Sequence, residues 1–184
     1  MALNDQSTRI RDGEELDAAI IDSYLKAHIP GLSGKPQISQ FPGGASNLTY
    51  LLEYPQQEFV LRRPPFGHKA KSAHDMGREY RILNQLNAGF PYCPKAYVHC
   101  TDESVIGSEF YVMERVNGII LRADLPAELN FSPAQTSQLC KSFIDKLVEL
   151  HNVDYQACGL GDLGKPEGYV ARQISGWSDR YEKA

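Results

Sequence analysis

The sequence is short of three features that would place it in a special class: cysteine pairs, long apolar runs and a large net charge. Its four cysteines, Cys93, Cys100, Cys140 and Cys158, form no CxxC pair. The spacing of Cys93, His99 and Cys100 does not fit a zinc site, so we expect reduced, partly buried thiols. A net charge of −4 argues against a general nucleic-acid binder.

Targeting and membrane segments are not expected either. No run approaches the ~18 consecutive apolar residues of a membrane span. Residues 1–13 are polar and lack the apolar core of a signal peptide. With 42% hydrophobic and 23% charged residues, the 184-residue chain is not expected to be disordered. We predict a cytoplasmic protein with no membrane partner, long enough for one domain or two small lobes.

The sequence of residues 38–63 predicts three strands separated by a glycine-rich loop and a turn. Aliphatic, aromatic and threonine side chains dominate three short runs, and turn residues separate them. These runs are Ile38–Phe41, Leu48–Leu52 and Phe59–Arg63. We expect an antiparallel unit whose third strand ends at Pro64.

The loop between the first two strands has the residue types of a phosphate site. Gly43 and Gly44 let backbone N–H groups approach a ligand closely, and Ser46 and Asn47 add side-chain donors. Arg62 follows one strand later, and its guanidinium can bind phosphate. A Gly-Gly loop between strands is more often a plain turn, so these residues alone favour the turn.

A helix expected over about residues 73–86 carries a carboxylate on its apolar face. This residue, Glu79, must find a partner there, because an unpaired buried charge is very unfavourable. Arg62 is one candidate partner. The alternative is a surface pair with Arg78 or Arg81, and the helix pattern alone does not decide between the two.

The remaining elements complete an α+β pattern with five strands and one helix inserted after the third. Ser72 followed by Asp75, and Ser132 followed by Gln135, have the pattern of helix capping boxes. The further helices are expected over 14–28, from Pro133 to His151 and from Tyr169 onward, and the further strands over 95–100 and 108–113.

The last helix presents an aromatic and aliphatic stripe that nothing later in the sequence covers. Its members are Val170, Ile174, Trp177 and Tyr181. An exposed stripe of this kind indicates a missing partner. We expect that a carboxyl-terminal portion is absent or that another chain covers the stripe. With the stripe uncovered, this chain could associate through the Trp177 helix, and the sequence does not define an oligomeric state.

Several segments together resemble the aminoglycoside phosphotransferase family, in the branch that is fused to, or encoded beside, acyl-CoA dehydrogenases. The resemblance covers nearly the whole chain after residue 35. It rests on the runs that begin at Phe41, Phe59, Ser72, Gly107, Leu150 and Gly159, and on Trp177. The family has a protein-kinase-like fold, whose small lobe is a five-stranded antiparallel sheet with one inserted helix.

The resemblance implies a nucleotide site and assigns its residues. The loop over the phosphates would be formed by Gly43, Gly44, Ala45, Ser46 and Asn47. Arg62 would take the place of the lysine that usually holds the α- and β-phosphates, and Glu79 would orient it. Met113 to Val116 would be the hinge, with backbone groups of Glu114 and Val116 facing the adenine.

The catalytic segment of the family does not occur in this sequence. That segment is a His-Gly-Asp loop with an asparagine five residues on, followed by a metal-binding aspartate. The nearest matches are His74-Asp75 and the run from His151 to Asp154, and we interpret both as structural. We therefore expect no catalytic or metal-binding residue in this chain, and we expect the Mg²⁺ ligands in a missing carboxyl-terminal part.

The resulting prediction is an ATP-dependent phosphotransferase that acts on a hydroxyl of a small molecule, either a hydroxyacyl compound or an aminoglycoside. Its expected parts are an amino-terminal helical extension (1–35), a kinase-like small lobe (36–116) and a hinge with the start of a helical lobe (117–184), which ends before the catalytic loop. Because that loop is absent, we expect residues 1–184 alone to be inactive. The alternative is a non-catalytic nucleotide- or partner-binding module. A third interpretation, an unrelated α+β protein, requires Arg62 and Glu79 to lie far apart.

Overall fold

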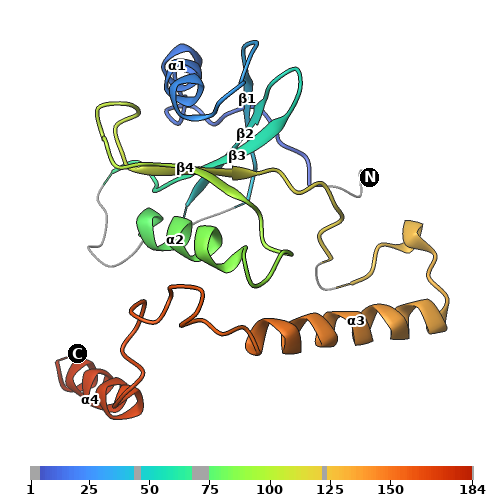
Figure 1. The fold of residues 1–184 in the computed structure, drawn as a ribbon, viewed down its shortest axis with the longest axis vertical. Helices are drawn as coiled ribbons and strands as arrows, with labels where there is room; N and C mark the ends of the chain where they lie inside the picture. Colours follow the sequence, from blue (N-terminus) through green and yellow to red (C-terminus); the bar gives the residue numbers. More distant parts are fainter. Residues whose placement is uncertain (1–4, 44–46, 68–74, 122–123, 184) are drawn as a thin grey trace.

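The computed structural model describes residues 5–43, 47–67, 75–121 and 124–183. Its helices and strands follow one another in the predicted order (Figure 1). They are α1 (Ala18–His28), β1 (Gln37–Gln40), β2 (Leu48–Glu53), β3 (Glu58–Arg63), α2 (Met76–Leu86), β4 (Ala96–Cys100), β5 (Phe110–Glu114), the 3₁₀ turn η1 (Ala127–Leu129), α3 (Pro133–His151) and α4 (Tyr169–Glu182).

The five strands form one antiparallel sheet in the order β1-β2-β3-β5-β4. β5 lies between β3 and β4, so the chain that contains α2 leaves the sheet after β3 and returns at the far edge. This confirms the predicted five-stranded sheet with one inserted helix.

The two faces of the sheet carry different residues because successive side chains along a strand point to opposite faces. One face forms the main core against α1, which contributes Ile21 and Leu25. The strands supply the rest of this core, which includes Leu48, Tyr50, Leu52, Phe59, Leu61, Val98, Cys100, Phe110 and Val112. The other face packs against α2, which contacts β4 and β5. Figure 1 shows α1 and α2 on opposite sides of the sheet.

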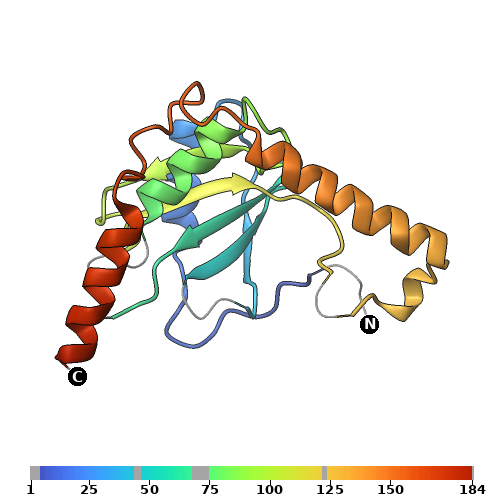
Figure 2. The ribbon, with the colours of Figure 1, turned by 90° about the horizontal axis from the view of Figure 1, so that it is seen from below.

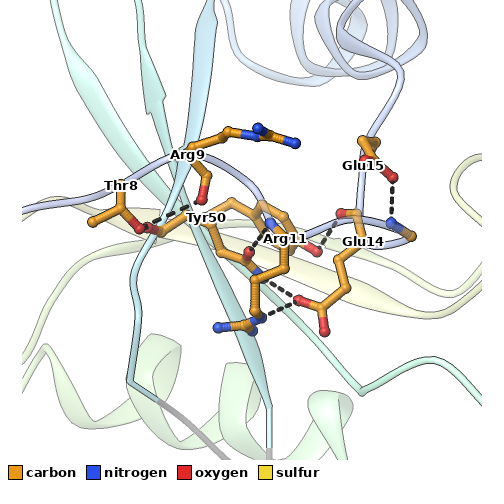
Figure 3. A network of polar contacts seen from close by, with 8 residues as sticks. Thr8, Arg9, Arg11, Glu14, Glu15 and Tyr50 are labelled. Carbon is orange, nitrogen blue, oxygen red and sulfur yellow. Dashed lines mark hydrogen bonds and ion pairs between the residues drawn. The ribbon is translucent and has the colours of Figure 1, made fainter.

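Polar contacts fix the segment before α1 against the sheet (Figure 3). The Glu14 carboxylate accepts hydrogen bonds from Arg11 Nε at 2.7 Å and from Gln40 Nε2 at 2.5 Å. The Tyr50 hydroxyl donates to the Glu14 carbonyl at 2.8 Å. Burial raises the pKa of Tyr50 to about 12, so this hydroxyl stays protonated and remains a donor.

Two predicted helix starts differ from the structure because an aspartate takes the cap. α1 begins at Ala18 and not at Glu14, since the Asp17 side chain accepts the backbone N–H groups of Ala19 and Ile20. α2 begins at Met76, where Asp75 is the N-cap and accepts from the Arg78 N–H at 2.8 Å. Asp75 is therefore the cap and not the third residue of a capping box. The predicted cap Ser72 lies outside the described residues.

The start of α3 was predicted correctly. Ser132 and Gln135 form a capping box, and Pro133 occupies the first turn. Figures 1 and 2 show α3 and α4 extending away from the sheet. Their apolar side chains are exposed, as the sequence predicted for the stripe on α4; Trp177, for example, is 63% exposed.

All four cysteines are free thiols, as expected, although Cys140 on α3 is exposed and not partly buried. Within the described part of the chain, no helix is both long and apolar enough to cross a membrane.

Candidate functional site

The neighbouring arginines at the end of β3 point to opposite faces of the sheet. Arg63 lies on the core face and is 2% exposed. Its guanidinium donates to the carbonyls of Pro64 and Ile106 and lies 3.7 Å from the centre of the Phe66 ring. Burial lowers the pKa of Arg63. Arg62 lies on the face that α2 covers, so only Arg62 is available to a site beside that helix.

The carboxylate of Glu79 on α2 is the centre of a polar cluster. Arg62 Nη1 lies 3.2 Å from Glu79 Oε2. The Tyr111 hydroxyl donates to the same Oε2 at 2.9 Å, and Asn47 Nδ2 donates to Oε1 at 3.0 Å. The predicted pairing of Glu79 with Arg62 is therefore confirmed, and Arg81 pairs elsewhere, with Asp162.

This cluster is half-buried, which changes the expected strength of its ion pair. The side chains of Arg62 and Glu79 are each 31% exposed, whereas the sequence suggested a buried pair. Solvent screening therefore weakens the pair. The hydroxyl of Tyr111 is better shielded, and burial raises its pKa above the ordinary range. It stays protonated as a donor to the carboxylate.

Arg62 has further hydrogen-bonding capacity. Among the residues that the structure describes, no acceptor reaches its buried Nε. Its Nη1 also lies 3.5 Å from the Tyr111 hydroxyl. The Arg62 side chain is 31% exposed and a guanidinium has five N–H donors, so it can bind an additional acceptor, such as a phosphate oxygen.

A cavity of about 550 Å³ lies on the same face of the sheet. Val60 and Met113, which are register partners on β3 and β5, line it. Arg62 and Tyr111 are the next such pair on this face, about 7 Å along the strands. The further lining residues are Asp5, Phe41, Gly43, Thr49, Pro94, Glu114, Arg115, Val116, Gly118, Ile119 and Ile120.

The structure thus brings most of the predicted site residues to two adjacent places. Gly43, Met113, Glu114 and Val116 line the cavity, and Asn47, Arg62 and Glu79 form the polar cluster beside it. Gly44, Ala45 and Ser46 lie outside the described residues. For every residue of the predicted site, the role in holding a nucleotide remains a prediction.

The structure limits which backbone groups of Glu114, in the predicted hinge, are available to a ligand. The Glu114 N–H donates to the Lys95 carbonyl at 2.8 Å, and the Glu114 side chain accepts from the Lys95 N–H at 3.1 Å. The Glu114 N–H is therefore occupied within the sheet and is not a donor to a ligand. Of the two backbone groups of Glu114, only the carbonyl is left for the predicted contact with adenine.

Two residues of this region, Tyr111 and Arg115, were not among the predicted site residues. Tyr111 joins the Glu79 cluster. The Arg115 guanidinium lies 4.9 Å from the centre of the Phe41 ring and donates to the Asp5 carbonyl at 3.1 Å. The alternation of β5 could have placed Tyr111 on the face of Met113. The contacts of Arg115 depend on the path of the amino-terminal segment, for which the sequence has no signal.

Of the two matches to a catalytic loop, the structure describes the run from His151 to Asp154 in full and only Asp75 of the other. His74 lies outside the described residues. The Asp154 carboxylate accepts the backbone N–H groups of Gln156 and Ala157, which stabilises the turn after α3. Among the described residues, no group of three or more His, Cys, Asp or Glu side chains could hold a metal ion.

The chain is similar in sequence to known proteins. The chain is 37% identical to acyl-CoA dehydrogenase family member 11 of Gallus gallus. The alignment is 190 positions long and covers all of this chain and 24% of that protein. The human protein of the same name is 37% identical over 92% of this chain and 22% of its own length. The chain thus spans about a quarter of these relatives.

A solved structure shares the fold. It is a crystal structure from Ralstonia eutropha of a protein described as a candidate aminoglycoside phosphotransferase, with a TM-score of 0.76 and 36% identity. The match covers 91% of this chain and 48% of that one. The sequence model of the phosphotransferase enzyme family matches residues 37–184. The chain therefore belongs to the phosphotransferase enzyme family.

Proposed function

We propose that this chain forms the nucleotide-binding part of an ATP-dependent phosphotransferase. The observation that carries the proposal is the position of Arg62. Its guanidinium is oriented by Glu79 and its side chain is partly exposed, on the sheet face that also forms the cavity. An apolar cavity beside a cation, about 7 Å away along the strands, suits a nucleoside with its phosphates.

The cavity has the properties that a purine base requires. Val60 and Met113 supply apolar surface from the sheet, and Val116 and Ile120 supply it from the segment after β5. The Glu114 carbonyl, one of the backbone groups expected to face the adenine, would accept a hydrogen bond from its exocyclic amino group. Gly43 lines the same cavity at the start of the loop that is expected over the phosphates.

In this proposal the residues of the chain bind and orient but do not react. Arg62 would hold phosphate oxygens while Glu79, Tyr111 and Asn47 fix its position. Such fixed positive charge stabilises phosphoryl transfer because negative charge is spread over the transferred group. No residue of this chain is assigned as the base that accepts the hydroxyl proton. The described residues include no group of three or more His, Cys, Asp or Glu side chains that could hold the Mg²⁺ expected from the family, so no residue of this chain is assigned to that ion.

The acceptor is proposed to be a hydroxyl group of a small molecule. Relatives that contain a matching segment are named as acyl-CoA dehydrogenases, which favours a hydroxyacyl compound over an aminoglycoside. The transfer would break the bond between the γ-phosphorus and its bridging oxygen, form a bond to the acceptor oxygen and release ADP.

Calorimetric titration with ATP tests the proposal, on the protein in its full natural length and on Arg62→Ala. We expect the substitution to lower affinity roughly tenfold or more, because it removes charge-assisted hydrogen bonds. The control is Arg78→Ala, an exposed arginine on the same helix as Glu79, which should bind ATP normally. Failure of the folded wild-type protein to bind ATP would refute the proposal. Binding without transfer to any hydroxyl substrate would support the alternative, a non-catalytic module.

A further inference from the structure

A second set of contacts holds α2 from the side opposite the sheet. In Figures 1 and 2 the orange-red segment between α3 and α4 runs beside α2. Arg81 on α2 donates through Nη2 to the Gly159 carbonyl at 2.7 Å. Its guanidinium also forms a two-pronged pair with the Asp162 carboxylate, through Nη1 at 3.2 Å to Oδ2 and through Nη2 to Oδ1.

These contacts continue along one side of the helix. Arg81 and Gln85 are four residues apart on α2, which places them on one side of the helix, and Gly89 lies in the turn that follows it. A Cβ atom on Gly159 would lie 3.4 Å from Gln85 Oε1, and a Cβ atom on Gly89 would lie 3.0 Å from Cys158 Sγ. The segment therefore packs closely against α2 and against the turn that follows it.

The opposite side of α2 faces the sheet and the proposed site. Met76 is fully buried there, Tyr80 stacks on the His99 ring of β4, and Glu79 reaches Arg62. α2 thus lies between the sheet and the segment 153–164. Its orientation about its own axis sets the position of the Glu79 carboxylate, so contacts on either side affect the cluster.

We infer that Arg81 is a positioning residue, which holds Glu79 against Arg62 by fixing α2 to Asp162 and Gly159. The inference rests on the proposed function for its effect on nucleotide binding. Backbone connects the sheet to α3 only through residues 115–132, and Arg81 adds a direct contact between the two parts. Asp162 is an anchor for this contact and not a ligand-binding residue.

The strength of the contact follows from its exposure. The side chains of Arg81 and Asp162 are 39% and 74% exposed, so water and salt screen the pair. Their mutual hydrogen bonds raise the pKa of Arg81 and lower that of Asp162, so both groups are charged near neutral pH. Such a pair can set an orientation while it contributes little to the stability of the whole fold.

The test compares Arg81→Gln and Asp162→Asn with Arg78→Gln, an equal charge change on α2, in the protein of full natural length. Each of the first two variants should raise the dissociation constant for ATP roughly two- to fivefold with little change in Tm. The double variant should be no worse than Arg81→Gln alone, because without the Arg81 guanidinium the Asp162 carboxylate has no contact with α2 left to lose. The exchanged pair Arg81→Glu with Asp162→Arg should recover part of the affinity.

A second measurement separates this inference from the proposed function. Amide hydrogen exchange over residues 76–86, without nucleotide, should be faster in Arg81→Gln than in Arg78→Gln. Equal exchange rates in Arg81→Gln and Arg78→Gln would overturn the inference. If the wild-type protein binds ATP, unchanged ATP affinity in both Arg81→Gln and Asp162→Asn would also overturn it. If the wild-type protein does not bind ATP but the exchange rates differ, the contact holds and the proposed function is wrong.

Discussion

Arg62 and Tyr111 are register partners on β3 and β5, and both reach the Glu79 carboxylate. Neither residue alone would fix this carboxylate. The phenol donates one hydrogen bond and the guanidinium supplies the charge, while Asn47 occupies the second oxygen. The cluster therefore depends on three strands or loops and one helix, and a change at Glu79 affects all of them.

Glu79→Ala should lower the free energy of unfolding by about 1–2 kcal/mol. The loss stays modest because the Arg62 pair is partly exposed to solvent, but Asn47, which is 5% exposed, loses a hydrogen-bond partner. Urea denaturation measures the change, and Glu103→Ala, at an exposed turn, is the control. Equal stability of the two variants would contradict the role of Glu79 as the centre of the cluster.

Arg63→Met should be much more destabilising than Arg62→Met, although the residues are neighbours. The Arg63 guanidinium donates to the carbonyls of Pro64 and Ile106 and packs on the ring of Phe66, which is itself exposed. Removing it leaves buried acceptors without a donor, which should lower the free energy of unfolding by about 2–4 kcal/mol. Arg62→Met should instead reduce ATP affinity with a small effect on stability. Similar unfolding midpoints for the two variants would show that the two faces of β3 are assigned wrongly.

Strong patterns in the sequence predicted the elements, and period two would also have predicted the division of Arg62 and Arg63 between faces. The helix 133–151 was predicted with both ends correct, and its start is marked by a proline and a capping box. The partners of Glu79 were harder to predict. Arg62 came from the family resemblance, whereas Tyr111 requires β5 to lie beside β3, and sequence order alone would place β4 there.

Contacts between distant segments could not be predicted from local patterns. Arg81 and Asp162 lie 81 positions apart, and each reads in the sequence as an ordinary exposed charge. The contact of Arg115 with the Asp5 carbonyl spans 110 positions. No periodicity or turn signal reports such a pair, since its geometry is set by the path of whole elements.

Stability should decrease in alkaline solution, and Tyr50 should contribute to the decrease. Burial raises the pKa of this phenol from 10.0 to about 12. Between these values the unfolded chain loses the proton while the folded chain keeps it, so the contribution is present below pH 10 and is lost as pH rises. The slope from one such group approaches about 1.4 kcal/mol per pH unit.

Tyr50→Phe should therefore flatten the loss of stability between pH 10 and 12, measured as the unfolding midpoint in urea at each pH. The variant should be less stable at neutral pH because the hydrogen bond to the Glu14 carbonyl is absent. Tyr155→Phe, at an exposed position, is the matched control and should follow the wild-type curve. A parallel curve for Tyr50→Phe would mean that this phenol titrates alike in both states.

Gly77→Ala tests how closely α2 packs on the sheet. A Cβ atom at Gly77 would lie 3.3 Å from Glu109 Oε1 and 3.3 Å from His99 Cε1, and those two side chains are joined by a 2.6 Å contact. Alanine normally stabilises a helix relative to glycine by roughly 1 kcal/mol. Here the methyl group must displace a paired histidine and glutamate, so the gain should be lost.

The matched control is Gly176→Ala on α4, where a Cβ atom meets nothing within 4 Å. Circular dichroism should show more stable helix for Gly176→Ala, whereas Gly77→Ala should leave the melting temperature unchanged or lower it. Because α2 carries Glu79, Gly77→Ala should also weaken ATP binding if the helix moves away from β4. A Gly77→Ala protein that is more stable and binds ATP as the wild type does would show that α2 has room to move without disturbing the Arg62 cluster.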